Sequence, residues 1–325
     1  MKKILLATTM LAGTAGFAAA EVAVSGYAEI GIIRSEAGFA GSTNAQFHQD
    51  VEVTFTMSGE TDGGLSFGAA IDLDETDVAA GDDSGTTVFV SGAFGKLTMG
   101  DTDGALDWAV ADAGALTSMG DDHTTHVFYF AANGFDGTHD GQVVRYEYSF
   151  GDFGVALSYE QAGNNATGTL ADDNIGIGAT YSMDMGGTAL KFGLGYQAGS
   201  DSDGVVYTNG DVIGASVSAE LAGGFSVSLG YTKTDYDALD VAGAASALVD
   251  FAHTGLGVTY TTGALSLHAN IGHYNPDVGA SDSTYGLAVN YDLGGGAVVM
   301  AGYGSDVGAA AGDQSQYSIG LGLSF

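Results

Sequence analysis

The chain of 325 residues has no cysteine, one proline and few basic side chains. Without cysteine it can form no disulfide, thiolate metal site, cysteine nucleophile or lipoprotein anchor. Its seven lysines and arginines are outnumbered by 40 aspartates and glutamates, which gives a formal net charge of −33. Nucleic-acid binding and electrostatic binding to anionic lipid both require a basic surface, so the charge excludes both as working hypotheses.

Long apolar runs are also lacking beyond the N-terminus. Two lysines, an apolar stretch and three alanines predict a secretory signal peptide over residues 1–20, so we expect the mature chain to begin at Glu21. The apolar stretch is shorter than the ~20 residues of a spanning helix. Removal of Lys2 and Lys3 leaves five basic residues and a formal charge of −35. If the mature chain crosses a membrane, it does so with strands.

Glycine and strict alternation characterise the rest of the chain. The 54 glycines suit a protein of many strands and tight turns. In Gln316–Phe325 one parity is apolar and the other carries Ser and Gly, which is the pattern of a strand with one apolar face. The apolar parity repeatedly finishes on an aromatic residue, as in Val155–Tyr159 and Phe225–Tyr231. An outer-membrane barrel turns such a face toward lipid and rims it with aromatics, so the pattern favours lipid.

Turn signals divide residues 21–325 into 16 such segments, and we predict an all-β fold, a 16-stranded antiparallel transmembrane β-barrel. Turns after even-numbered strands are short, and loops after odd-numbered strands are longer and polar. This alternation is typical of bacterial outer-membrane barrels with both termini on the periplasmic side. The predicted strands are Val22–Arg34, Phe47–Ser58, Leu65–Asp74, Thr86–Gly92, Leu97–Asp101, Gln142–Phe150, Val155–Glu160, Asn174–Ser182, Ala189–Gln197, Val212–Glu220, Phe225–Lys233, Thr254–Tyr260, Leu265–Tyr274, Thr284–Tyr291, Ala297–Tyr303 and Gln316–Phe325.

One connection is much longer than the others. Residues 102–141 form a 40-residue connection after the fifth strand, and structureless loops beyond about 12–15 residues are usually functional or disordered. Its apolar content is too high for a solvated tail, and the available surface is the inside of the barrel. We therefore predict a third extracellular loop that folds inward as the constriction loop of a pore. Its apolar residues are Leu106, Trp108, Val110, Leu116, Met119, Phe128, Tyr129 and Phe130.

Four segments carry a resemblance to a known family: Glu21-Val22, Phe55–Gly59, Val88–Lys96 and Tyr291–Gly296. With the strand order, they make the chain similar to the general porins of alphaproteobacteria, the Rhodobacter type. The resemblance implies a homotrimer in outer-membrane lipid, exported through the periplasm, that lets small hydrophilic solutes diffuse passively. It implies no enzyme activity and no required cofactor. It also implies an eyelet in which acids on the third loop lie across from basic residues on the opposite wall.

The sequence departs from that family on the wall of the predicted pore. Rhodobacter-type porins place arginines and lysines on the inward faces of the first three strands. Val51, Val53 and Phe55 must take the lipid face, so the inward positions here are acidic. The predicted constriction comprises Glu29, Asp50, Glu52 and Asp72, with Asp74 beside them, the loop acids Asp101, Asp103, Asp107 and Asp112, and the single lumen-facing arginine Arg145.

The predicted constriction is therefore acidic on both sides. Two carboxylates ~6 Å apart at an effective dielectric constant of ~20 repel by roughly 3 kcal/mol, so such a cluster must protonate in part or hold cations. Charge rings at constrictions set ion selectivity, which favours a pore that prefers cations. Adaptation of the whole surface to high salt is the alternative explanation of the acids.

The sequence also contains candidate metal, catalytic and solute-binding residues. The loop acids, with Asp121 and Asp122, could hold Ca²⁺, although no EF-hand spacing is present. His123 and His126 allow a zinc site, and Ser266 beside His268 a hydrolase, but such patterns arise readily by chance. Arg145 either pairs with Glu147 or a loop acid or orients a solute, and Trp108 either anchors the loop or stacks on a sugar.

Two alternative functions remain open beside passive diffusion. One is a substrate-specific channel with a saturable binding site, and the other is a structural or adhesive surface barrel. The first would require an aromatic track or paired basic residues along the lumen, and the second a plugged lumen. A barrel of 16 strands leaves an aqueous channel, which favours a general diffusion pore.

Overall fold

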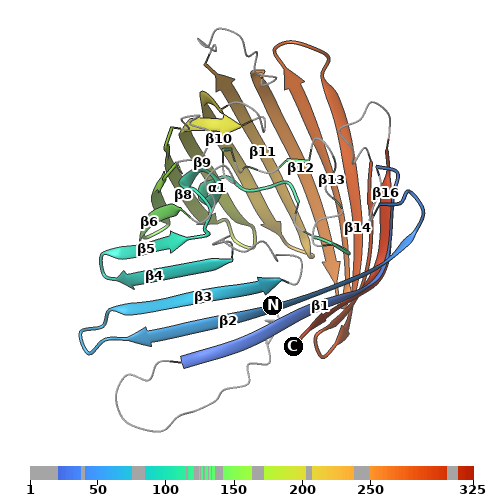
Figure 1. Ribbon diagram of the computed structural model, residues 1–325, viewed down its shortest axis with the longest axis horizontal. Coiled ribbons are helices and arrows are strands. Elements are labelled where there is room, and N and C mark those ends of the chain that lie inside the picture. The colour runs from blue at the N-terminus through green and yellow to red at the C-terminus, as the bar shows by residue number, and fades with distance from the viewer. Residues whose placement is uncertain are drawn as a thin grey trace.

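The computed structural model describes residues 21–37, 41–74, 85–114, 116–120, 142–162, 172–202, 207–237, 249–305 and 314–325, with 124, 126, 129, 130, 132, 134 and 135 of the long loop. Residues 1–20, the predicted signal peptide, lie outside the described residues. Within the described part, 16 strands form one closed barrel, in which β1 pairs with β16 (Figure 1). Every pair is antiparallel, which confirms the predicted fold class.

The observed strands follow the predicted ones closely. The largest differences are the extracellular ends of β9 and β10, which stay paired as far as Ser202 and Tyr207 because a hairpin can continue its ladder beyond the apolar band. The strands are β1 (Glu21–Ser35), β2 (Gln46–Glu60), β3 (Ser66–Asp74), β4 (Thr86–Gly92), β5 (Gly95–Gly100), β6 (Val143–Phe150), β7 (Phe153–Glu160), β8 (Asn174–Asp184), β9 (Ala189–Ser202), β10 (Tyr207–Leu221), β11 (Phe225–Tyr236), β12 (Phe251–Thr262), β13 (Leu265–Pro276), β14 (Asp282–Gly294), β15 (Ala297–Gly304) and β16 (Gln316–Ser324).

The apolar parity of the strands lies on the outside of the barrel. On β7, Leu157 is 54% exposed and points outward, whereas the inward Ala156 is 1% exposed. Aromatic rings gather on the outside near the short turns, where Phe150 stacks on Phe153 and Phe153 packs on Tyr181. The sequence therefore places its apolar side chains where lipid surrounds them, as an outer-membrane barrel requires.

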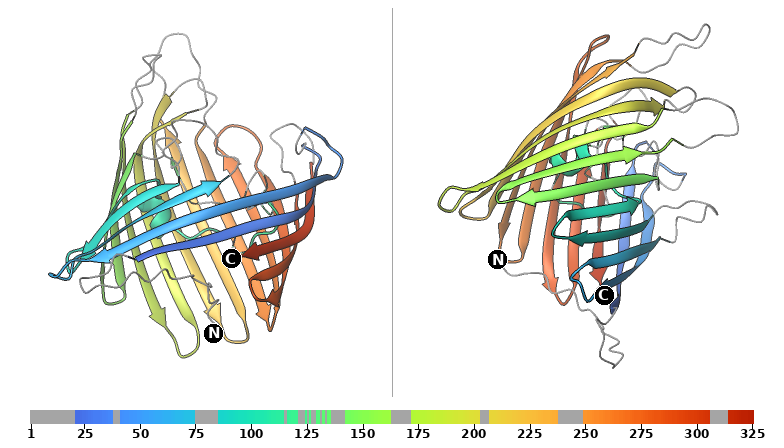
Figure 2. Two further views of the ribbon diagram at one scale, coloured as in Figure 1. Left: turned by 60° about the horizontal axis from the view of Figure 1, so that its bottom comes forward. Right: turned by 90° about the vertical axis from the view of Figure 1, so that its left-hand side faces the viewer.

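The connections alternate in length as predicted (Figure 2). Only Gly151 and Asp152 separate β6 from β7, and Gly151 has a φ of +62°, a conformation that glycine adopts without strain. Among the described residues, no helix combines the length and the apolar character needed to cross a membrane.

Candidate pore constriction

The long connection after β5 runs along the inner wall of the barrel. It begins with α1 (Ala105–Ala109), which packs against β7, β8 and β9 (Figure 1). Ala113 then lies against β12, and Met119 lies against β1 and β16. The chain returns with Thr124 against β14 and Phe130 against β11 and β12. The described part of the loop therefore contacts the wall from β7 round to β1.

Glycines on the inner wall make room for this loop. Gly178 on β8 pairs in register with Gly195 on β9, and Gly195 pairs with Gly214 on β10. A Cβ on Gly195 would lie only 2.6 Å from Leu106 Cδ1 and 2.9 Å from Leu106 Cα. From the sequence periodicity alone, these positions are small residues that face the lumen. Their alignment across neighbouring strands indicates in addition that another segment of the chain packs on them. We call this set the glycine groove: Gly31, Gly176, Gly178, Gly193, Gly195, Gly214, Gly230, Gly255, Gly257, Gly286 and Gly320.

The apolar side chains of the loop are buried against the wall. Leu106, Val110 and Phe130 form a cluster with Val212 of β10, and their exposed fractions are 1% or less. A second cluster joins Met119 to Ile33 of β1 and Met300 of β15. This packing agrees with the predicted reason for the loop's apolar content; Phe128 lies outside the described residues.

Inward hydroxyl groups hold the loop backbone in the groove. The amide of Ala105 donates to Ser158 Oγ at 2.9 Å, and the amide of Ala111 donates to Ser216 Oγ at 2.8 Å. Ser228 Oγ in turn donates to the carbonyl of Asp112 at 2.7 Å. These bonds satisfy backbone groups that the irregular loop would otherwise bury without partners.

A buried polar network fixes the returning limb of the loop. Glu160 is fully buried and accepts from Gln197 Nε2 at 2.8 Å and from Asn174 Nδ2 at 3.2 Å. Gln197 Oε1 accepts from the amide of Phe135 at 2.8 Å. Sequence analysis missed this network, because no local pattern separates its three residues from other inward polar side chains.

Glu29 lies inward as predicted, but the loop covers it. Its exposed fraction is 3%, and its carboxylate accepts from the backbone amide of Gly120 at 2.6 Å and from Tyr27 Oη at 2.8 Å. His48 Nε2 lies 3.0 Å from the same carboxylate. Glu29 therefore ties the far end of the loop to the wall and does not face open lumen.

The other predicted wall acids lie on β2 and β3, the strands that follow the strand of Glu29. Asp50 pairs in register with Glu29 and is 6% exposed. Glu52 is half-buried, and Asp72 is exposed and accepts from Thr54 Oγ1 at 3.0 Å. Asp50, Glu52 and Asp72, hereafter the wall acids, lie five or six strands away from β8, against which α1 packs. Carboxylates therefore occupy the wall across from the helix.

Comparisons with known proteins agree with this architecture. Residues 7–320 match the family model described as Gram-negative porin. The chain belongs to the Gram-negative porins. It is 31% identical over 293 residues to a porin of Rhodobacter capsulatus, which covers 87% of this chain and 93% of that protein.

Solved structures agree in fold with this porin. A porin refined at 1.8 Å resolution is 29% identical, covers 94% of this chain and all of its own, and superposes with a TM-score of 0.70. A variant of the Rh. blastica porin has 21% identity, the same coverage and a TM-score of 0.64. Family membership confirms the predicted outer-membrane location and the predicted passive diffusion channel. It also confirms the prediction that this protein is a porin and not an enzyme.

Two of the four predicted loop acids in this porin hold the chain in shape. Asp101 accepts a hydrogen bond from the amide of Gly85, across the hairpin end of β4 and β5. Asp112 Oδ1 accepts from the amide of Ala132 at 2.6 Å and so joins the two limbs of the loop. Asp103 has a side chain that is 63% exposed, so its carboxylate reaches water.

The surroundings of Asp107 shift its pKa. It lies half-buried on α1, which belongs to the loop and not to a spanning strand. Burial, together with the negative charges of Asp103 and Asp112, raises the pKa of Asp107 to about 7, and the positive charge of Arg145 opposes this shift. Asp107 therefore changes its charge near neutral pH.

Arg145 pairs with acidic residues, which is one of the two roles predicted for it. Its Nη1 donates to the carbonyl of Asp103 at 2.6 Å, and its Nη2 lies 3.5 Å from Glu147 Oε1. Trp108 Nε1 donates to Glu147 Oε2 at 3.1 Å, so the indole anchors the start of the loop. Both side chains hold α1 in place, which favours the anchoring roles over solute binding.

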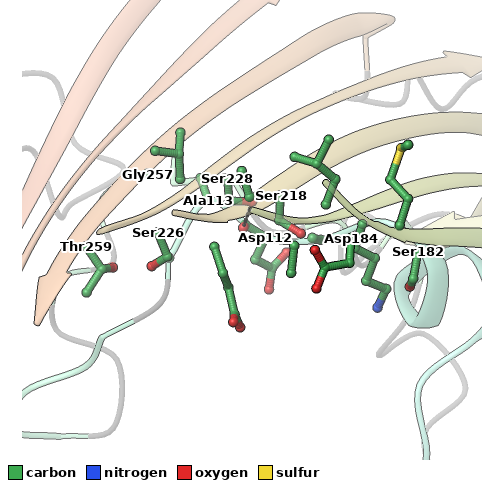
Figure 3. A pocket seen from close by; sticks show the side chains of 18 of the residues that line it. Asp112, Ala113, Ser182, Asp184, Ser218, Ser226, Ser228, Gly257 and Thr259 are labelled. Atoms are coloured by element: carbon green, nitrogen blue, oxygen red, sulfur yellow. Dashed lines mark hydrogen bonds between the residues drawn. The ribbon is translucent and has the colours of Figure 1, made fainter. Parts of the chain in front are cut away.

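Two inward lysines were missed by sequence analysis. Lys96 of β5 lies 3.8 Å from Glu147 and adds to the Arg145 network. Lys191 of β9 shares the inward parity of the glycine groove and lines a cavity of ≈ 620 Å³ below the loop (Figure 3). Their parity was readable from the sequence, but no motif marks either residue.

Two histidines, His126 and His268, serve as polar partners inside this porin. His126 Nε2 lies 3.0 Å from Asn270 Oδ1, and its Nδ1 contacts Thr284 Oγ1. His268 Nδ1 lies 2.8 Å from Thr259 Oγ1, and Ser266 pairs with Thr261 and not with His268. No group of three or more His, Cys, Asp or Glu side chains in the described part of the chain could hold a metal ion. Asp121, Asp122 and His123 lie outside the described residues.

Proposed function

We propose that this porin prefers cations and that the wall acids produce the preference. The observation that carries the proposal is their placement on β2 and β3, where the described inward positions include no lysine or arginine. On the loop side, Arg145 and Lys96 are paired with Asp103 and Glu147. The basic charge near α1 is thus compensated locally, and the wall opposite contributes negative potential to the lumen.

The test is a reversal-potential measurement across planar bilayers in a KCl gradient. We expect K⁺ to be favoured over Cl⁻ strongly at low salt and weakly at high salt, because the Debye length falls from ~10 Å at 0.1 M to ~3 Å at 1 M. A reversal potential near zero at 0.1 M mean salt would contradict the proposal.

The pKa of Asp107 adds a dependence on pH. An acid with a pKa of about 7 is mostly neutral at pH 6 and mostly ionised at pH 8, so the K⁺ preference should increase as the pH rises through 7. Reversal potentials measured from pH 5.5 to 8.5 check this. Asp107→Asn should remove the step near pH 7 and leave the remaining preference. A step that persists in this variant belongs to another group.

We also propose that the mature porin begins at Glu21 and assembles as a homotrimer. The composition of residues 1–20 supports the first statement, and family membership supports the second. N-terminal sequencing of protein from outer membranes tests the cleavage site. Native mass spectrometry in detergent tests the assembly, and a spectrum of monomers alone would reject the trimer.

Ca²⁺ is expected to act only as a cation that competes with K⁺ for the carboxylates of the lumen. Millimolar Ca²⁺ should lower the K⁺ conductance if carboxylates of the lumen bind it, and variants of the wall acids should weaken the effect. The described residues offer no preformed metal cluster, so no structural role is assigned to calcium.

A further inference from the structure

Lys191, which lines the cavity below the loop, differs from the other basic residues in its lack of an ion pair with the described residues. The mature chain has five basic residues, and four of them form ion pairs: Arg34 with Glu36, Lys96 with Glu147, Arg145 with Asp103 and Glu147, and Lys233 with Asp235. Lys191 forms none with any residue that the structure describes, and its side chain is exposed to the cavity. Because no ion pair among the described residues holds it, the ammonium group of Lys191 is available to an anionic group of a solute.

Hydroxyl groups flank this lysine on both sides. Strand register sets Ser182 of β8 and Ser218 of β10 directly opposite Lys191. Opposed residues in antiparallel strands have Cβ atoms about 4.5–5.5 Å apart, so all three side chains can reach one ligand. An ammonium group between two hydroxyl donors is suited to a carboxylate, which accepts several hydrogen bonds at once.

An acidic rung lies next to the basic one, toward the periplasmic turns. Glu220 follows Ser218 at the next inward position of β10, and Ser226 of β11 is opposite Glu220. Diagonal neighbours lie about 7–8 Å apart, with their Cβ atoms somewhat closer, so the lysine and the glutamate can both contact one small molecule. Asp184 of β8 lies on the same rung, and all these residues line the cavity (Figure 3).

The loop closes the cavity from above. Residues 111–114 line it, and Asp112 and Ala113 have their own backbone groups bonded to Ser228 and Phe130. The roof is therefore held in place without using Lys191, Glu220 or Ser218. Lys191, Glu220 and Ser218 therefore remain available to a solute, with positive and negative charge side by side.

We propose that this cavity is a transit subsite for small zwitterionic solutes, of which α-amino acids are the simplest. The carboxylate of the solute lies at Lys191, Ser182 and Ser218, and its ammonium group lies at Glu220 and Ser226. The subsite refines the diffusion pore proposed above and rests on it only in that solutes must enter the lumen. It does not depend on the wall acids, which lie on other strands.

The test adds L-serine to single channels in 0.1 M KCl at pH 7 and measures the K⁺ current. We expect a saturable decrease in current for the wild type. Lys191→Met and Glu220→Gln should each raise the half-saturating concentration about tenfold, because each removes one charge-assisted contact. Lys191→Arg should retain the effect. Glycerol, which has a similar size and no charge, should produce no saturable decrease.

Lys233→Met is the matched control, because it removes the same charge from an outer extracellular position where Lys233 pairs with Asp235. A current unaffected by L-serine, an equal effect of glycerol, or an unchanged half-saturating concentration in Lys191→Met would each overturn the proposal. If Lys191→Met fails to fold, Ser218→Ala with Glu220→Gln answers the same question. The wild-type reversal potential, measured in the same bilayers, reports the cation preference separately, so either proposal can fail alone.

Discussion

Replacing Asp50 and Glu52 with arginine should abolish or invert the preference of this porin for cations. Each replacement changes the wall by two unit charges. Even at the dielectric constant of water, one unit charge ~8 Å from an ion contributes ~0.5 kcal/mol, so four contribute ~2 kcal/mol. The K⁺ to Cl⁻ permeability ratio should therefore fall by more than about tenfold, as measured by reversal potentials at 0.1 M salt.

The position of the two acids supports so large an effect. Asp50 pairs in register with Glu29, and Glu52 pairs with Tyr27, one rung nearer the periplasm. An arginine at position 50 would lie opposite the buried carboxylate of Glu29, and an arginine at position 52 would reach the lumen. The exchange would also restore basic residues on a wall where Rhodobacter-type porins carry them.

A control with the same change of charge distinguishes the effect of the wall acids from that of acids elsewhere on the surface. Asp62 and Asp277 are exposed acids in turns at the two rims of the barrel. Asp62→Arg with Asp277→Arg should alter the permeability ratio far less, because charges beyond a Debye length are largely screened. An equal shift in both double variants would support the general adaptation to high salt and not the wall acids.

Deleting residues 114–125 should widen the pore. We expect the single-channel conductance to roughly double, because a layer of chain about 10 Å thick would leave the inner wall. Liposomes with the variant should also swell in larger sugars that the intact porin excludes. Unchanged conductance and swelling would mean that this part of the loop does not limit the pore.

The geometry of the loop favours this deletion over others. Ala113 lies at β12, and His126 contacts Asn270 of β13 and Thr284 of β14, so the new ends would be close together. The hydrogen bond from Ala113 N to Phe130 O also joins the two limbs on the near side of the cut. The deletion removes Met119 and Gly120 with their contacts to β1, and it keeps α1 and Phe130 in the glycine groove.

A substitution at the anchor serves as the companion experiment. Glu29→Gln keeps the size of the side chain but weakens its bond to the amide of Gly120, since a carboxylate is the stronger acceptor. It should increase fluctuations of the current without the large rise in conductance that the deletion produces. This contrast separates a loosened loop from a missing one.

The barrel follows from local patterns in the sequence. A strand repeats every two residues, so local alternation was sufficient to place 16 strands, their lipid face and their order. Turn length then gave the orientation, and the length and apolar content of residues 102–141 indicated a loop against the wall. The acidic character of the inward positions was also readable, because parity follows from a few aromatic and β-branched residues.

The role of each inward residue, by contrast, depends on the contacts that it makes in the folded chain. Glu29 is covered by Gly120, and Asp101 and Asp112 hold the chain, whereas Asp72 and Asp103 remain exposed. The sequence periodicity does not predict these contacts, because they join residues far apart in sequence through an irregular loop. The same holds for Lys191, which forms no ion pair with the described residues, and for the glycine groove, which is recognised only by the loop that packs on it.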